Sequence, residues 1–105
     1  MLCTTTDTIA GRKIRHEGLL HASAVSGANV VRDIREAITN VVGGQMNRYE
    51  YVLDQTIERA IEMICDKARE CGYDGIVGLK ISHPHITDGA IEVVVSGTGF
   101  RFDGD

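Results

Sequence analysis

Apolar residues in the first half of the chain change from a strand-like to a helix-like pattern near residue 30. Residues 1–9 are rich in threonine and predict a short strand, while residues 13–25 predict a strand or a bent pair of strands. Between residues 30 and 42, apolar residues recur every three or four positions, which predicts an amphipathic helix. Gly43-Gly44 is the expected end of that helix, because glycine readily adopts the left-handed conformation found there.

A second helix is predicted over residues 47–71. Asn47 with Glu50 three positions later resembles a capping box at its start, and Gly72 is the expected stop. The apolar stripe of this helix consists of Leu53, Ile57, Ala60, Ile61, Ile64, Ala68 and Cys71. A stripe at this spacing predicts a helix that packs one side against a core.

Beyond Gly72 the pattern returns to strands. Residues 75–81 and 90–102 predict two strands, joined by a hairpin loop that contains the only proline. Gly97 and Gly99 in the second of these strands predict a β-bulge or a close approach of the backbone. The predicted order is therefore β-β-α-α-β-β, and the fold class is α+β, two layers with helices on one face of a mainly antiparallel sheet.

Acidic residues form an unbroken row along the second helix at a spacing of four: Glu50, Asp54, Glu58, Glu62, Asp66 and Glu70. Like charges at this spacing oppose a helix by roughly 0.2–0.5 kcal/mol per pair. The row also drifts by about 40° around the helix at each step, so its members cannot all face one partner. The favoured interpretation is a solvated ridge, offset by the pairs Arg59–Glu62, Asp66–Arg69 and Lys67–Glu70.

Two other interpretations of the row stay open. Part of it could meet arginines of a neighbouring subunit, such as Arg32 or Arg35, since opposite charges across an interface attract. The row could also line a cation site, which is the weakest of the three interpretations.

The overall composition narrows the class of protein. A chain of 105 residues with 43% hydrophobic content predicts a single folded domain over residues 1–105. The net charge of −4 and the low aromatic content of 5% argue against nucleic-acid binding, which needs basic surfaces and aromatic platforms. Because neither a signal peptide nor a membrane span is recognisable, we expect a cytoplasmic protein and no membrane partner.

Two histidines in the predicted loop are candidate metal ligands. His83 and His85 are two positions apart, so in an extended segment both imidazoles point the same way. Imidazoles bind zinc, nickel and copper, and Asp88 can supply a third ligand after a turn. A divalent transition metal is therefore a candidate cofactor, although a polar loop explains the same residues. His16 and His21 face opposite sides of a regular strand and are weaker candidates.

The three cysteines have no chelating pattern. Cys65 and Cys71 lie about 120° apart on the helix, and Cys3 is distant from both in the sequence. An odd count without regular spacing does not indicate a disulfide framework, so we expect reduced thiols. Cys71 continues the apolar stripe and is predicted to be a small buried hydrophobic residue.

Catalytic signatures such as a nucleophile elbow, a phosphate-binding loop or a zinc-protease motif are absent from the sequence. We therefore expect a protein that is not an enzyme. The lowest-ranked alternative is an enzyme at a subunit interface, with Tyr49, Glu50 and Asp74 as polar candidates near helix ends.

Several segments together resemble the YbjQ-like family, which is described as uncharacterised or as heavy-metal-binding. They are TTTDTIAGRKI, GLLHASAVSGANVVRDIREAITNVVGGQMNRYE, CGYDGIVGLKI and VVVSGTGF. The most specific part combines Gly27-Ala28-Asn29, Gly43-Gly44 and Tyr49-Glu50. The resemblance implies a dodecin-like subunit that assembles with itself, as a homopentamer, through extra short strands. Part of the acidic row could then lie at a subunit boundary.

The sequence departs from the family pattern at three places. Ala22-Ser23 replaces a Gly-Glu pair, Gln45 replaces an arginine after the double glycine, and residues 72–78 read GYDGIVG in place of GADAVVG. If the family binds a ligand through that glutamate or arginine, this chain lacks the group. The leading hypothesis is a ring-forming binding or assembly module without enzymatic activity. The alternative is a metal-binding protein that uses His83 and His85 or a site between subunits.

Overall fold

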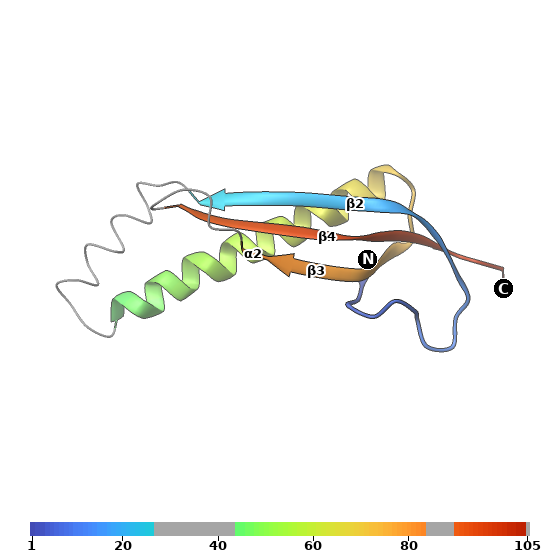
Figure 1. Ribbon diagram of the computed structural model, residues 1–105, viewed down its shortest axis with the longest axis horizontal. Coiled ribbons are helices and arrows are strands. Elements are labelled where there is room, and N and C mark those ends of the chain that lie inside the picture. The colour runs from blue at the N-terminus through green and yellow to red at the C-terminus, as the bar shows by residue number, and fades with distance from the viewer. Residues whose placement is uncertain (27–43, 84–89, 105) are drawn as a thin grey trace.

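The computed structural model describes residues 1–26, 44–83 and 90–104, and it shows one long helix across one face of a four-stranded sheet (Figure 1). The elements are β1 (Leu2–Cys3), β2 (Ile14–Ser26), α2 (Gly44–Glu70), β3 (Gly75–Ser82) and β4 (Ile91–Phe102). The strand order is β1-β3-β4-β2, in which β1 runs parallel to β3 and the other neighbours are antiparallel. The predicted α+β class and mainly antiparallel sheet are confirmed.

The core lies between α2 and the sheet. Ala60, Ile64 and Ala68 of α2 are fully buried, as their spacing of four residues predicts. They face inward-pointing residues of three strands: Leu20, Ala22 and Ala24 of β2, Ile76 and Leu79 of β3, and Ile91, Val93 and Val95 of β4. Alternate residues of β2 and β4 are exposed or half-buried, which is the pattern of strands covered on one face.

The C-terminal end of α2 follows the predicted stop at Gly72 but corrects the prediction for Cys71. The N–H of Tyr73 donates to the carbonyl of Ala68 at 2.9 Å, and the N–H of Gly72 donates to that of Arg69 at 3.0 Å. This is a Schellman motif, in which Gly72 supplies the left-handed conformation with φ of 76°. The helical hydrogen bonds extend to Cys71, whose N–H donates to the carbonyl of Lys67 at 3.1 Å, and the chain turns at Gly72. Cys71 is exposed, and Tyr73 packs against the core in its place.

Gly97 and Gly99 of β4 confirm the predicted close approach. A Cβ on Gly97 would lie 2.6 Å from Cγ2 of Ile76, and one on Gly99 would lie 2.1 Å from the ring of Tyr73. The bulges are on the neighbouring strands. The register of β2 shifts at Glu17, opposite Gly99, and that of β3 shifts at Gly78 and Leu79, opposite Gly97.

Residues 4–13 pack against part of the sheet face that α2 does not cover. Thr4 and Thr6 exchange backbone hydrogen bonds of 2.8–2.9 Å with β3. Alternation places Val77 and Phe100 on this face, and both are buried. The guanidinium of Arg12 lies 3.8 Å from the ring centre of Phe102, which makes edge contact with Phe100. The predicted strand over residues 1–9 is therefore wrong beyond Cys3, where the regular pairing with β3 ends.

Other boundaries differ in detail from the predictions. The helix predicted from residue 47 begins at Gly44, so Asn47 lies inside α2 and not at its N-cap. Residues 13–25 form one strand, β2, with a bulge in place of a bend between two strands. The helix predicted over residues 30–42 and the loop over residues 84–89 lie outside the described residues.

Replacement of Gly99 by alanine tests the close approach at Tyr73. Because the new Cβ would overlap the ring, we expect Gly99→Ala to lower the free energy of unfolding by roughly 1–3 kcal/mol. Ser96→Ala, on the same strand but half-buried, is the matched control and should change it by no more than about 0.5 kcal/mol. Urea denaturation measures both, and equal stability of the two variants would contradict the packing.

Candidate functional site

Two of the three cysteines meet between the first strand and the helix α2. Cys3 lies on β1, and Cys65 lies on α2 one residue after Ile64 of the buried stripe. Their sulfur atoms are 3.2 Å apart, although 62 residues separate them along the chain. Spacing in the sequence gave no sign of this pair, because the contact arises only when the helix crosses the sheet beside the first strand.

The environment of Cys3 favours the neutral form of its thiol. Cys65 is only 9% exposed and Cys3 is half-buried. Burial, followed by the hydrogen bond with Cys65, raises the pKa of the Cys3 thiol from 9.0 to about 11. The N-terminal ammonium and Arg69 act in the opposite direction and are weaker. The Cys3 thiol is therefore protonated at neutral pH, and two positively charged groups act on it.

The structure describes only one of the three predicted metal ligands in the loop. The backbone carbonyl of Glu92 lies within hydrogen-bond distance of Nδ1 of His83, which is exposed at the end of β3. Such a bond orients an imidazole and leaves Nε2 for another partner. His85 and Asp88 lie outside the described residues, so the structure does not test whether the three come together. His16 and His21 on β2 are both exposed.

The acidic row is exposed at every position from Glu50 to Glu70. Among the described residues, Asp66 is its only member in an ion pair, at 2.8 Å from Arg69. The predicted pairs of Arg59 and Lys67 with acids of the row do not form, because both cations bond to carbonyls of β2 instead. Arg59 donates to Val25 and Lys67 donates to His21, each at 2.7 Å.

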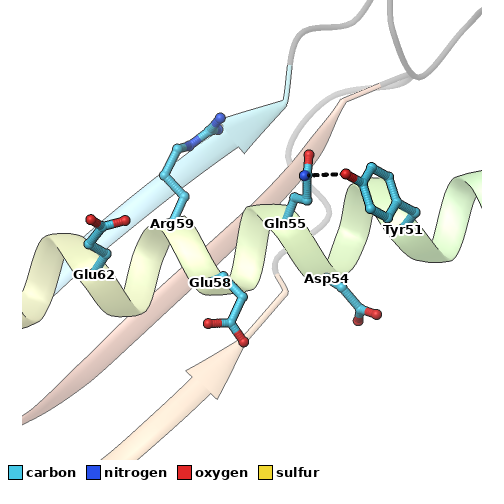
Figure 2. Close-up of a pocket in the computed structure, with 6 residues that line it drawn as sticks. All are labelled: Tyr51, Asp54, Gln55, Glu58, Arg59 and Glu62. Carbon is cyan, nitrogen blue, oxygen red and sulfur yellow. Dashed lines mark hydrogen bonds between the residues drawn. The ribbon is translucent and has the colours of Figure 1, made fainter.

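A shallow hollow of about 630 Å³ follows the exposed side of α2. Its lining consists of Tyr51, Asp54, Gln55, Glu58, Arg59 and Glu62. In Figure 2, Asp54 and Glu58 point to one side of the helix while Glu62 and Arg59 point to the other. The carboxylates do not converge on one point, so this geometry supports a solvated ridge and not a cation site among these residues.

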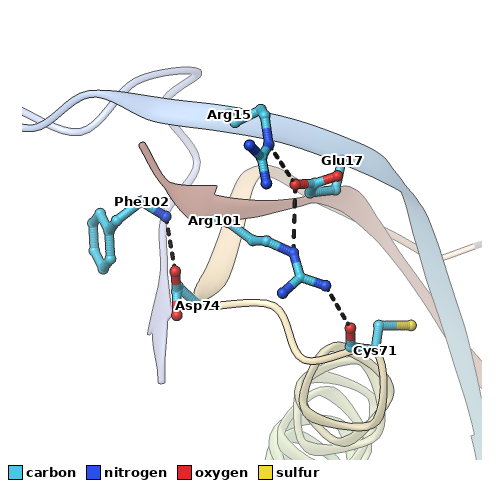
Figure 3. A network of polar contacts seen from close by, with 6 residues as sticks. All are labelled: Arg15, Glu17, Cys71, Asp74, Arg101 and Phe102. Carbon is cyan, nitrogen blue, oxygen red and sulfur yellow. Dashed lines mark hydrogen bonds and ion pairs between the residues drawn. The ribbon is translucent and has the colours of Figure 1, made fainter. Parts of the chain in front are cut away.

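The polar residues at the other end of α2 have structural partners. Arg101 of β4 reaches the carbonyl of Cys71 at 3.1 Å and Glu17 at 3.4 Å, and Glu17 also pairs with Arg15 at 2.8 Å (Figure 3). Asp74, a candidate for the enzyme alternative, accepts the backbone N–H of Phe102 at 2.8 Å. This bond explains Asp74 as a residue that holds the end of β4. Glu50 is exposed, and the side chain of Tyr49 is not described.

In the part of the chain that the structure describes, the thiol pair is the one place where two metal-ligand side chains are in contact. No group of three or more His, Cys, Asp or Glu side chains gathers there with metal-ligand geometry. The adjacent thiols of Cys3 and Cys65 are the ligand type that soft metals prefer. The described helices also include none long and apolar enough to cross a membrane.

Comparison with known proteins places the chain in a family. A family model described as "Putative heavy-metal-binding" matches residues 1–103. The chain belongs to the YbjQ-like family. Among its relatives, a UPF0145 protein of Geobacillus kaustophilus is 35% identical over 96% of this chain and 97% of its own length. A UPF0145 protein of Synechococcus sp. is also 35% identical, over 96% of this chain and 98% of its own.

A solved structure confirms the fold of this YbjQ-like chain. It is a protein of unknown function from Pediococcus pentosaceus, assigned to the DUF74 family. The TM-score is 0.69 with 19% identity, and the match covers 98% of each chain. The family resemblance inferred from the sequence is thus confirmed. The names of these relatives attach no reaction to the family.

The raised pKa of Cys3 predicts a pH dependence of stability. Because the pKa is higher in the folded state, the folded form is favoured fully below about pH 9, and this contribution is lost as the pH rises towards about 11. We expect Cys3→Ser to lose less stability than the natural chain between these pH values. Urea denaturation at several pH values measures the difference.

Cys71→Ser is the control for this experiment, because Cys71 is exposed and takes no part in the sulfur contact. It should keep the pH dependence of the natural chain. If Cys3→Ser loses stability with rising pH as steeply as Cys71→Ser does, the burial of the thiol pair would be contradicted.

Proposed function

We propose that this protein is a self-assembling binding module without catalytic activity, in which copies join head to tail through their sheet edges. The observation that carries the proposal is that the sheet has two unlike edges with unpaired backbone groups in the described residues. Exposed edges of this kind readily pair with another chain. Pairing of unlike edges gives a heterologous contact, which closes into a ring when the rotation per subunit allows it.

The first edge is that of β2, the last strand in the order β1-β3-β4-β2. Twelve of its thirteen residues pair with β4, and no other described strand pairs with β2. Lys67 and Arg59 cover the carbonyls of His21 and Val25 on the outer side. Because backbone groups alternate along a strand, those of Leu19 and Ser23 point to the same outer side. This edge is thus partly covered by cations of α2 but keeps backbone donors for a second copy.

The second edge is the end of β3. β1 pairs only with Gly75 and Ile76, and the hydrogen bonds of the N-terminal segment end at Leu79. The last part of β3, Lys80 to Ser82, therefore has a described neighbour only in β4. A β2 edge of one copy against this β3 edge of the next would extend the sheet from subunit to subunit.

The outward face of the sheet supports the same proposal. Leu19 is 76% exposed and Val25 is 51% exposed, both on the face of β2 away from α2. Exposed apolar side chains beside a free edge favour burial against another protein surface. A ring of five cytoplasmic subunits is the form that the family resemblance implies, and part of the acidic ridge could then lie at the boundary between copies.

A proline at Ser23 tests the assembly. Ser23→Pro removes one outward N–H from the β2 edge and leaves the hydrogen bonds to β4 unaffected, so we expect it to convert a ring into folded monomers. Ser23→Ala keeps the N–H and should keep the ring. Native mass spectrometry reports the assembly, and circular dichroism verifies that each variant is folded.

A second variant at the same edge tests the proposal if the proline variant does not fold. Leu19→Lys places a charge on the exposed face beside the same edge, where lysine opposes strand pairing. The proposal requires at least one folded variant to lose the assembly. It would be overturned by a natural chain that is monomeric, or by folded edge variants that assemble like the natural chain.

Metal binding through the loop at the end of β3 is the second candidate function. The contact between Nδ1 of His83 and the carbonyl of Glu92 supports it. Such a contact orients the imidazole, and an oriented imidazole binds a metal better than a freely rotating one. The proposed ligands are His83, His85 and Asp88, with a divalent transition metal. We expect His83→Ala with His85→Ala to abolish stoichiometric zinc or nickel binding in equilibrium dialysis, while His16→Ala with His21→Ala leaves it unchanged. Equal binding by both double variants would reject these ligands.

A further inference from the structure

The thiol pair of Cys3 and Cys65 has the character of a ligand set. The two side chains come from separate elements, meet with sulfurs 3.2 Å apart, and lie at the border between the core and solvent. Neither sulfur takes part in the proposed edge pairing. The site is contained in one subunit, so it stands independently of self-assembly.

We propose that Cys3 and Cys65 bind one soft monovalent metal ion, such as Cu(I) or Ag(I), in a two-coordinate site. Thiolates are the ligands that Cu(I) prefers over carboxylates and carbonyls. In the described residues no third His, Cys, Asp or Glu joins the pair, which disfavours zinc with its usual four ligands. A pair of thiols with no further ligand therefore selects an ion that accepts two-coordination.

Binding exchanges protons for the metal ion. Two thiols and one monovalent cation give a bis-thiolate complex of charge −1 and release two protons. Both sulfur–hydrogen bonds break and two sulfur–metal bonds form, with no change of oxidation state. The Arg69 guanidinium and the N-terminal ammonium are the positive groups that act on Cys3, and both favour the negative complex.

The first strand lets the metal ion reach the thiols and lets the distance between the two sulfurs change. Metal–thiolate bonds are about 2.3 Å long, so a linear arrangement places its sulfurs about 4.6 Å apart, farther than in the free dithiol. Cys65 is buried in the C-terminal part of α2, whereas Cys3 is half-exposed on a strand of two residues. The increase in the distance between the sulfurs therefore comes from a movement of Cys3, because Cys3 can move with the least disturbance of the core.

The experiment is a Cu(I) titration of the reduced full chain without oxygen, in competition with a chromogenic Cu(I) chelator. We expect one Cu(I) per chain, and an apparent association constant that rises about 100-fold per pH unit near neutrality because two protons leave. Cys71→Ser, which removes the exposed thiol outside the pair, should bind with unchanged affinity and stoichiometry.

Cys3→Ser and Cys65→Ala should each lose at least about 100-fold in affinity, since one soft ligand remains. Cys3→Ser is the decisive variant if Cys65→Ala fails to fold, because Cys3 lies on the short first strand. Retained affinity in folded Cys3→Ser would overturn the proposal, as would loss of the ion in Cys71→Ser. Failure of the natural chain to compete for Cu(I) while its thiols are shown by mass to be reduced would overturn it too.

Discussion

Close packing of α2 on the sheet through small side chains is the constraint on which the rest of the described structure depends. Ala60 and Ala68 of α2 face a sheet whose β2 contributes Ala22 and Ala24 to the same core. Where β4 must let Ile76 and Tyr73 come close, it has glycine. Small residues on both layers bring the helix near the strands, and the larger aliphatic residues between them fill the remaining space.

This packing covers only one of the two faces of the sheet in the described residues. The helix buries one face, and residues 4–13 bury only the part of the other face around Val77 and Phe100. In the described residues, Leu19 and Val25 of β2 and the edges of β2 and β3 therefore stay exposed. This exposure is the ground on which we propose a second copy there.

The same packing stabilises α2 against the repulsion within its acidic ridge. Repulsion between acids four residues apart weakens a helix by tenths of a kcal/mol per pair, whereas full burial of one large aliphatic side chain such as Ile64 contributes about 1.5–3 kcal/mol. Tertiary burial therefore dominates. Arg59 and Lys67 donate hydrogen bonds to backbone carbonyls of β2 and so attach the helix to the edge of the sheet. The acidic side chains of the helix are exposed to solvent.

Local patterns predicted the elements of this fold well. The helical stripe, the strands on either side of Gly72 and beyond residue 90, and the glycines at close approaches are each properties of neighbouring residues, and the structure confirms them. The family resemblance could also be read from short segments alone. Element ends were less predictable: Cys71 continues the stripe by spacing, yet the turn at Gly72 removes it from the core.

What the sequence by itself determined is the α+β class, the buried side of α2 and the exposed acidic side, because side-chain periodicity follows directly from backbone geometry. Only the tertiary structure decided the partners of Arg59 and Lys67, the path of residues 4–13 and the meeting of Cys3 with Cys65. Each of these is a contact between segments far apart along the chain. Their distance depends on how the helix crosses the sheet, which spacing along one segment does not encode.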